Sequence, residues 1–183
     1  MGRIVSNFFI ALDGVVEAPN EWHFPYFDDD MGRVVGQGMT DQSAFLMGRR
    51  LYDEWSEFWP QQGPEVPFSA HINAIPKYVV THRPIEGDLW QGTTVLGADP
   101  VDELRAIKDG TDGDIAMSGC ATTVRWLLAN DLLDELALLV HPIAVGKGQR
   151  LFEDTPTVPL TLLSSEALSS GVLFLRYAPA GTA

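Results

Sequence analysis

The sequence predicts an α/β fold with a mainly parallel sheet of about eight strands, about four flanking helices and an antiparallel C-terminal hairpin. Three observations support this prediction. Apolar runs of strand length alternate with stretches of helical periodicity over residues 3–145. Residues 114–145 read as strand, glycine turn, helix and strand, a βαβ unit whose strands are expected to pair in parallel. Residues 158–163 and 172–177 are two late apolar runs, which is typical of an antiparallel pair.

The expected strands are short apolar runs bounded by turns. Almost every residue of the first run is apolar, which is typical of a central strand covered on both faces. In chain order the runs are 3–12, 44–47, 77–81, 93–96, 115–117, 136–145, 158–163 and 172–177.

Four segments show the spacing of an amphipathic helix. The first follows Asp28 to Asp30, whose carboxylates suit a helix start, and the third begins at Asp99-Pro100, where proline suits the first turn. The residues expected to share one face of each helix are, in chain order, Met31, Val34, Val35 and Gly38; Leu51, Tyr52, Trp55, Phe58 and Trp59; Val101, Leu104 and Ile107; and Val124, Leu127 and Leu128. Asn130 is expected to end the last helix.

Composition narrows the classes of function. The chain of 183 residues suits one domain, 1–183, and 45% hydrophobic with 20% charged residues is ordinary for a soluble globular protein. A net charge of −13 argues against nucleic acid and against anionic membranes as partners. The single cysteine, Cys120, excludes an intrachain disulfide. Without a signal-peptide pattern or a run of about 20 apolar residues, we expect a cytoplasmic protein.

The turn from Ser118 to Thr123 is the first candidate for ligand binding. Its residues are Ser118, Gly119, Cys120, Ala121, Thr122 and Thr123, between a strand and a helix start. Small residues let a phosphate approach the backbone N–H groups at the positive end of a helix dipole. A tight turn without a ligand is the alternative, since the motif is not G-x-G-x-x-G.

Two basic clusters also follow expected strands. Gly48-Arg49-Arg50 opens a helix, and Thr81-His82-Arg83 closes the next strand. Ligands of parallel sheets lie beyond the carboxyl ends of the strands. A phosphomonoester between Arg49, Arg50 and Arg83 would favour NADP over NAD, whereas a solvated arginine pair is the alternative.

Asp28 is the candidate proton donor or substrate anchor. It follows a loop, residues 15–27, that is rich in aromatic side chains and is expected to cover something. Partial burial behind Trp22, Phe24, Tyr26 and Phe27 would raise the pKa of the Asp28 carboxyl. Helix N-capping is the alternative role. His23, His71, His82 and His141 show no metal-binding spacing, so no metal site is expected.

Five segments together resemble the dihydrofolate reductase-like family, in the branch of the C-terminal reductase domain of bifunctional riboflavin biosynthesis enzymes. They are FFIALDGVVEAP, FLMGRRLYDEW, KYVVTHRP, IAMSGCATTVRWLLANDLLDELALLVHPIAVGKGQRLF and VLFLRYAP, and they cover nearly the whole chain. The resemblance implies an eight-stranded, mainly parallel sheet and an NADPH-dependent reductase.

The resemblance also implies roles for particular residues. The cofactor would lie against Ala11, Asp13, Gly14 and Val15 at its nicotinamide, Gly48, Arg49 and Arg50 at its adenosine phosphates, Thr81, His82 and Arg83 at its 2′-phosphate and adenine, and Ser118 to Thr123 at its pyrophosphate. The substrate, a small heterocycle, carbonyl or imine, would lie between Trp22, Phe24, Phe27, Gly146 and Phe152, near Asp28.

Two departures from the family pattern qualify this reading. Cys120 stands where the family commonly has a second glycine, and Asp28 is one residue further from the tryptophan than the acid of true dihydrofolate reductases. One cysteine cannot build the zinc deaminase half of the riboflavin enzymes, so a freestanding reductase domain is expected. A non-catalytic nucleotide- or flavin-binding protein on the same fold is the alternative. Apolar loops and five tryptophans favour a homodimer.

Overall fold

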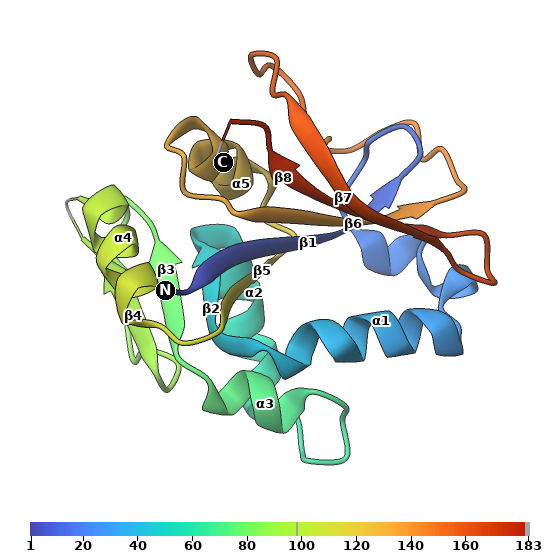
Figure 1. Cartoon of the computed structure of the whole chain (residues 1–183). Coiled ribbons are helices and arrows are strands. Elements are labelled where there is room, and N and C mark those ends of the chain that lie inside the picture. The colour runs from blue at the N-terminus through green and yellow to red at the C-terminus, as the bar shows by residue number, and fades with distance from the viewer. Residues whose placement is uncertain (98, 182–183) are drawn as a thin grey trace.

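One sheet contains all eight strands of the computed structural model, which describes residues 1–97 and 99–181 (Figure 1). Their order is β4-β3-β2-β5-β1-β6-β8-β7. The strands from β4 through to β6 in that order, β4, β3, β2, β5, β1 and β6, are parallel to one another. Strand β8 is antiparallel to both of its neighbours, β6 and β7. The bounds are β1 (Arg3–Ala11), β2 (Gln42–Gly48), β3 (Lys77–Val80), β4 (Thr93–Leu96), β5 (Asp114–Ser118), β6 (Glu135–His141), β7 (Leu160–Ala167) and β8 (Leu173–Pro179). The predicted dihydrofolate reductase-like architecture is therefore confirmed.

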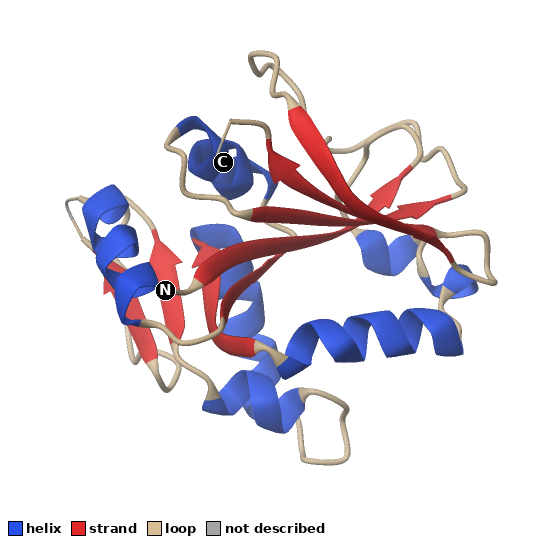
Figure 2. Ribbon diagram, in the orientation of Figure 1, coloured by secondary structure: helices blue, strands red, loops and turns tan. Residues whose placement is uncertain are grey.

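Helices cover both faces of this sheet (Figure 2). They are α1 (Asp29–Thr40), α2 (Arg49–Phe58), α3 (Ser69–Ala74), α4 (Pro100–Gly110) and α5 (Ala121–Ala129). The buried residues of α4 and α5 pack with one face, in the core that contains Ile4 and Phe8 of β1. Those of α1, α2 and α3 pack in two further clusters, against Leu139 of β6 and Met47 of β2.

Helix α3 was not predicted. It has six residues, too few to show a repeated apolar spacing, and it starts after Phe68, whose φ of 71° is left-handed. Tertiary contact secures it, since its Ile72 is buried in the cluster with Tyr52 of α2.

The predicted direct pairing of the two strands of the βαβ unit was wrong. Strands β5 and β6 are parallel, but β1 lies between them and pairs with both. Residues 5–7 of β1 pair with both strands; Val5, for example, lies opposite Ala116 on one side and Glu135 on the other. A long crossover through α5 can pass over an intervening strand, and the apolar β1 is suited to the buried centre of the sheet.

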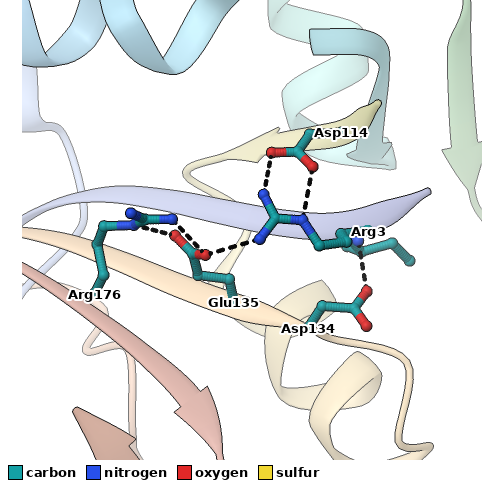
Figure 3. Close-up of polar contacts among 6 residues, drawn as sticks. Arg3, Asp114, Asp134, Glu135 and Arg176 are labelled. Atoms are coloured by element: carbon teal, nitrogen blue, oxygen red, sulfur yellow. Dashed lines mark hydrogen bonds and ion pairs between the residues drawn. The ribbon is translucent and has the colours of Figure 1, made fainter. Parts of the chain in front are cut away.

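Charged side chains join the amino ends of the central strands (Figure 3). The buried Glu135 of β6 accepts hydrogen bonds from Arg176 of β8, at 2.5 and 2.8 Å, and from Arg3 of β1 at 3.4 Å. Arg3 also binds Asp114 of β5 through two hydrogen bonds. Four adjacent strands are thus tied together at this edge. The opposite edge, at the carboxyl ends of β2, β3 and β5, holds the groove described next.

Candidate functional site

A groove of about 950 Å³ lies beyond the carboxyl ends of β2, β3 and β5. It brings together the three clusters that the sequence predicts to bind a cofactor. Its lining includes Gly48, Arg49 and Arg50 after β2, Thr81, His82 and Arg83 after β3, and Ser118 to Thr123 after β5. These segments are far apart in the chain and meet because parallel strands end at one edge of the sheet.

The start of α5 offers the groove a site for an anion. The N–H groups of a first helical turn have no intrahelical partners, and among the described residues no side chain caps this helix in their place. Gly119 has a φ of 65°, and a Cβ there would meet no atom within 4 Å, so the turn leaves open space in front of the helix. These features suit a phosphate group.

Cys120 occupies the base of the same turn. Its sulfur accepts a hydrogen bond from the Gly48 N–H at 3.4 Å and therefore links β2 to the start of α5. Burial raises the pKa of Cys120 to about 11, so the side chain is a neutral thiol at physiological pH. A neutral, partly buried thiol is a packing group rather than a nucleophile.

The arginines of the groove differ in their contacts. Arg49 binds Asp53 at 2.7 Å and donates to the carbonyl oxygens of Arg83 and Pro84 at 3.1 and 2.6 Å, so it fastens α2 to the loop after β3. Arg50 is exposed and lies 3.2 Å from Glu54 and 3.8 Å from Glu17. The Arg83 side chain has no recorded partner within the described residues. Arg50 and Arg83 are therefore more available to a ligand than Arg49.

The segment predicted to meet the nicotinamide lies beside the groove. Ala11 and Val15 are buried, and Asp13 accepts a hydrogen bond from the Gly146 N–H at 2.7 Å, which lowers the pKa of the Asp13 carboxyl. Val15 also pairs with Arg150. Residues 11–16 thus form a ribbon with residues 143–151, and the next residues, 16–20, line the groove. Contact of Ala11, Asp13, Gly14 and Val15 with a cofactor stays a prediction.

Asp28 caps α1, and the predicted rise in its pKa was wrong. Its carboxylate accepts a hydrogen bond from the Met31 N–H at 2.9 Å and another from the Ser169 hydroxyl at 3.1 Å. The Met31 N–H, followed by the Ser169 and Ser170 hydroxyls, favours the charged form and lowers the pKa of Asp28. Asp28 is outside the groove lining. A catalytic role for it stays a prediction.

The predicted substrate residues do not line the groove either. Trp22 is buried, donates from its indole nitrogen to the Glu17 carbonyl at 3.0 Å and packs edge-on against His141. Phe24, Phe27 and Phe152 are exposed large apolar side chains. Gly146 donates to Asp13, as described above. Substrate contact by these five residues stays a prediction.

Several groove residues were missed from the sequence. The lining also includes Phe9, Glu17, Leu51, Glu54, Trp55, Trp126 and Gln149. Arg50, Leu51, Glu54 and Trp55 share one side of α2, so the helical spacing around Arg50 could have indicated Glu54 and Trp55. Glu17 and Gln149 come from loops, where no periodicity points to them.

His23 and His141 form a buried pair that the sequence did not single out. Their ring centroids are 6.1 Å apart, and His23 also stacks on Phe9 of the groove at 4.5 Å. Burial lowers the pKa of both imidazoles, and for His23 the neighbouring His141 lowers it further. Within the described part of the chain, no group of three or more His, Cys, Asp or Glu side chains could hold a metal ion. Nor is any described helix long and apolar enough to cross a membrane.

Comparison with known proteins gives the family of the chain. The profile of the RibD C-terminal domain matches residues 3–174. The uncharacterised protein YyaP of Bacillus subtilis (strain 168) is 27% identical over 180 residues, covering 96% of this chain and 94% of that protein.

Solved structures show the same fold. A putative riboflavin biosynthesis protein from Shewanella sp. PV-4 superposes with a TM-score of 0.74 at 20% identity, over 97% of this chain and 98% of that one. Dihydrofolate reductase from Enterococcus faecalis, complexed with NADP(H), superposes with a TM-score of 0.63 at 14% identity, over 98% of this chain and 97% of that one. The diaminohydroxyphosphoribosylaminopyrimidine deaminase/5-amino-6-(5-phosphoribosylamino)uracil reductase of Thermotoga maritima gives a TM-score of 0.68 at 16% identity, over 98% of this chain and 57% of that one. With a dihydrofolate reductase-like fold and a profile match over most of its length, the chain belongs to the RibD C-terminal domain family.

Proposed function

We propose that this protein is an NADPH-dependent reductase that acts on a small heterocyclic, carbonyl or imine substrate. The observation that carries the proposal is the convergence of Gly48 to Arg50, Thr81 to Arg83 and Ser118 to Thr123 on one groove. Membership of the RibD C-terminal domain family supports a reductase. When bound, NADPH would supply the hydride.

The chain's own residues would bind and orient the two reactants. The free N–H groups at the start of α5 suit the pyrophosphate, and the exposed guanidinium of Arg83 suits the phosphomonoester that distinguishes NADPH from NADH. Phe9, Leu51 and Trp55 supply apolar surface for a flat ring. Close placement of two reactants is itself a large part of catalysis in such a site.

Titration of the tryptophan fluorescence with NADPH and with NADH tests the proposal. We expect NADPH to bind clearly more tightly than NADH. Arg83→Gln should weaken NADPH binding about 10-fold and NADH binding much less, because a charged hydrogen bond to phosphate is lost. Arg105→Gln, which removes an exposed arginine of α4 that is paired with Asp102, is the control. Equal affinity for the two nucleotides in the wild type would refute the phosphate assignment.

We also propose a homodimer. Leu162 and Leu163 of the edge strand β7 are each 52% exposed, and an edge strand with apolar side chains is suited to pairing with another chain. Light scattering of the purified protein gives the mass in solution, and a mass of one chain at micromolar concentration would refute the dimer.

A further inference from the structure

His23 and His141 are buried, and each has one ring nitrogen without a polar partner among the described residues. His23 is 7% exposed and His141 is fully buried. The Nδ1 atom of His141 lies 2.8 Å from the Leu139 carbonyl oxygen and so carries the proton, which leaves its Nε2 as an acceptor. That Nε2 and the Nδ1 of His23 are buried with no hydrogen-bond partner in the described part of the chain. A fold that leaves two such atoms unsatisfied gives up stability, which points to a role beyond packing.

Aromatic rings surround the pair. His23 lies between Phe9, at 4.5 Å, and Phe24, at 4.2 Å, with Phe27 edge-on at 5.9 Å. His141 contacts Phe9, Trp22 and Tyr26 edge-on. Among the groups recorded against the two histidines, the titratable ones are the partner imidazole and the Tyr26 phenol, and none is a carboxylate. A proton on either imidazole would therefore have no counter-charge there.

The pair is mechanically connected to the groove by two routes. Phe9 stacks on His23 and lines the groove. Trp22, the neighbour of His23, donates to the Glu17 carbonyl at 3.0 Å, and the Glu17 carboxylate accepts from the Gln149 N–H at 2.7 Å. Glu17 and Gln149 both line the groove. His23 thus packs on one groove residue, Phe9, and its neighbour Trp22 holds a second, Glu17.

We propose that His23, packed against His141, is a positioning residue whose neutral form holds residues 15–27 in place as one wall of the groove. A protonated His23 carries an N–H group at both ring nitrogens, and its buried Nδ1 can find an acceptor only if the ring leaves the aromatic stack. The loop then moves with it, and the groove loses part of its wall. The lowered pKa of both imidazoles agrees with this arrangement.

Hydrogen–deuterium exchange of the whole protein tests the proposal without a ligand. Wild type and His23→Phe, which keeps a stacked ring but cannot titrate, are compared at equal pH so that the intrinsic exchange rate cancels. Peptides from residues 15–27 should exchange equally in both proteins at pH 7.5. At pH 5.5 they should exchange about 10-fold faster in the wild type, since one proton is coupled to opening. His23→Gln serves as a second non-titrating variant in case the larger ring disturbs the fold.

A second readout uses NADPH affinity and rests on the proposed function. The ratio of the NADPH dissociation constants of wild type and His23→Phe should rise about 10-fold between pH 7.5 and 5.5, and the comparison cancels ionisation of the nucleotide. His71→Gln, remote from the groove lining, should follow the wild type. If NADPH does not bind but exchange behaves as expected, the reductase proposal fails and this one stands. An exchange ratio that is the same at both pH values overturns the positioning role, whatever NADPH does.

Discussion

Gly48 lies so close to Thr123 that a Cβ atom at position 48 would be 2.5 Å from the Thr123 Oγ1. The φ of Gly48 is −81°, which any residue can adopt, so glycine is needed there for space and not for backbone freedom. The contact joins the end of β2 to the first turn of α5, the two segments that form the base of the groove.

Gly48→Ala should therefore destabilise the protein by about 1–2 kcal/mol, because the added methyl group must displace α5. Removing the opposing oxygen in Gly48→Ala/Thr123→Ala should recover most of that loss, whereas Gly48→Ala/Thr123→Ser, which keeps the oxygen, should not. Chemical denaturation of the variants measures the differences. As a control, Gly36→Ala adds a methyl group in α1 where no atom lies within 4 Å and should not destabilise. Equal stability of Gly48→Ala and wild type would contradict the steric account.

Asp28 offers a test that separates capping from catalysis. Asparagine also caps helices well, so Asp28→Asn should lower the melting temperature less than Asp28→Ala does. Because the native contacts lower the pKa of Asp28, its contribution to stability is present above the unfolded pKa and is lost as the pH falls through the folded value. Turnover on a working substrate decides the catalytic role. The catalytic prediction expects a loss of roughly 100-fold in Asp28→Asn, whereas turnover that persists would leave helix capping as the role of Asp28.

The parts of the fold that the sequence predicted correctly depend on local patterns. Continuous apolar runs indicated the strands, and the small-residue turn at Gly119 marked the start of α5. The three cofactor clusters could be placed together because parallel strands order their ends, a rule that does not depend on side-chain detail.

Long-range packing accounts for what the sequence did not reveal. No local signal shows that β1 separates β5 from β6, because pairing partners are chosen by the whole sheet. The pKa of Asp28 is lowered first by the local Met31 N–H and then by Ser169 and Ser170, which are far along the chain from it. His23 and His141 are also distant in sequence, and their contact follows from the way the loop after β1 folds over the end of β6.

Glu135 should contribute strongly to stability from the edge remote from the groove. It is 2% exposed and binds both Arg3 and Arg176. Glu135→Gln keeps the shape but removes the charge that the two guanidinium groups share, so we expect a loss of about 1–3 kcal/mol in the free energy of unfolding. Arg105→Gln, which breaks the exposed pair with Asp102, should cost less than about 0.5 kcal/mol. Urea denaturation at low and high salt measures the free energy of unfolding of both variants. An equal loss in the two would refute the claim that the ion pairs of the buried Glu135 contribute more than the exposed pair of Arg105.

Lys77 should make the free energy of unfolding depend on pH in the alkaline range. The residue is fully buried, and its ammonium donates to the carbonyl oxygens of Asn73, Ile75 and Gln91 at 2.9 to 3.1 Å. Burial lowers the pKa of Lys77 from 10.5 to about 8. Between these values the unfolded chain binds more protons than the folded one, so the free energy of unfolding should rise from pH 8 to pH 9.5, by at most about 1.4 kcal/mol per pH unit.

Lys77→Met should abolish that rise and, at pH 7, lower stability by about 1–3 kcal/mol, since three carbonyl groups lose their donor. Lys147→Met, in the exposed loop after β6, is the control and should keep the wild-type slope. Urea titrations at half-unit pH steps give the slopes directly. If wild type and Lys77→Met have the same slope from pH 8 to 9.5, the three carbonyl oxygens hold Lys77 in its charged form throughout, and burial does not control its protonation.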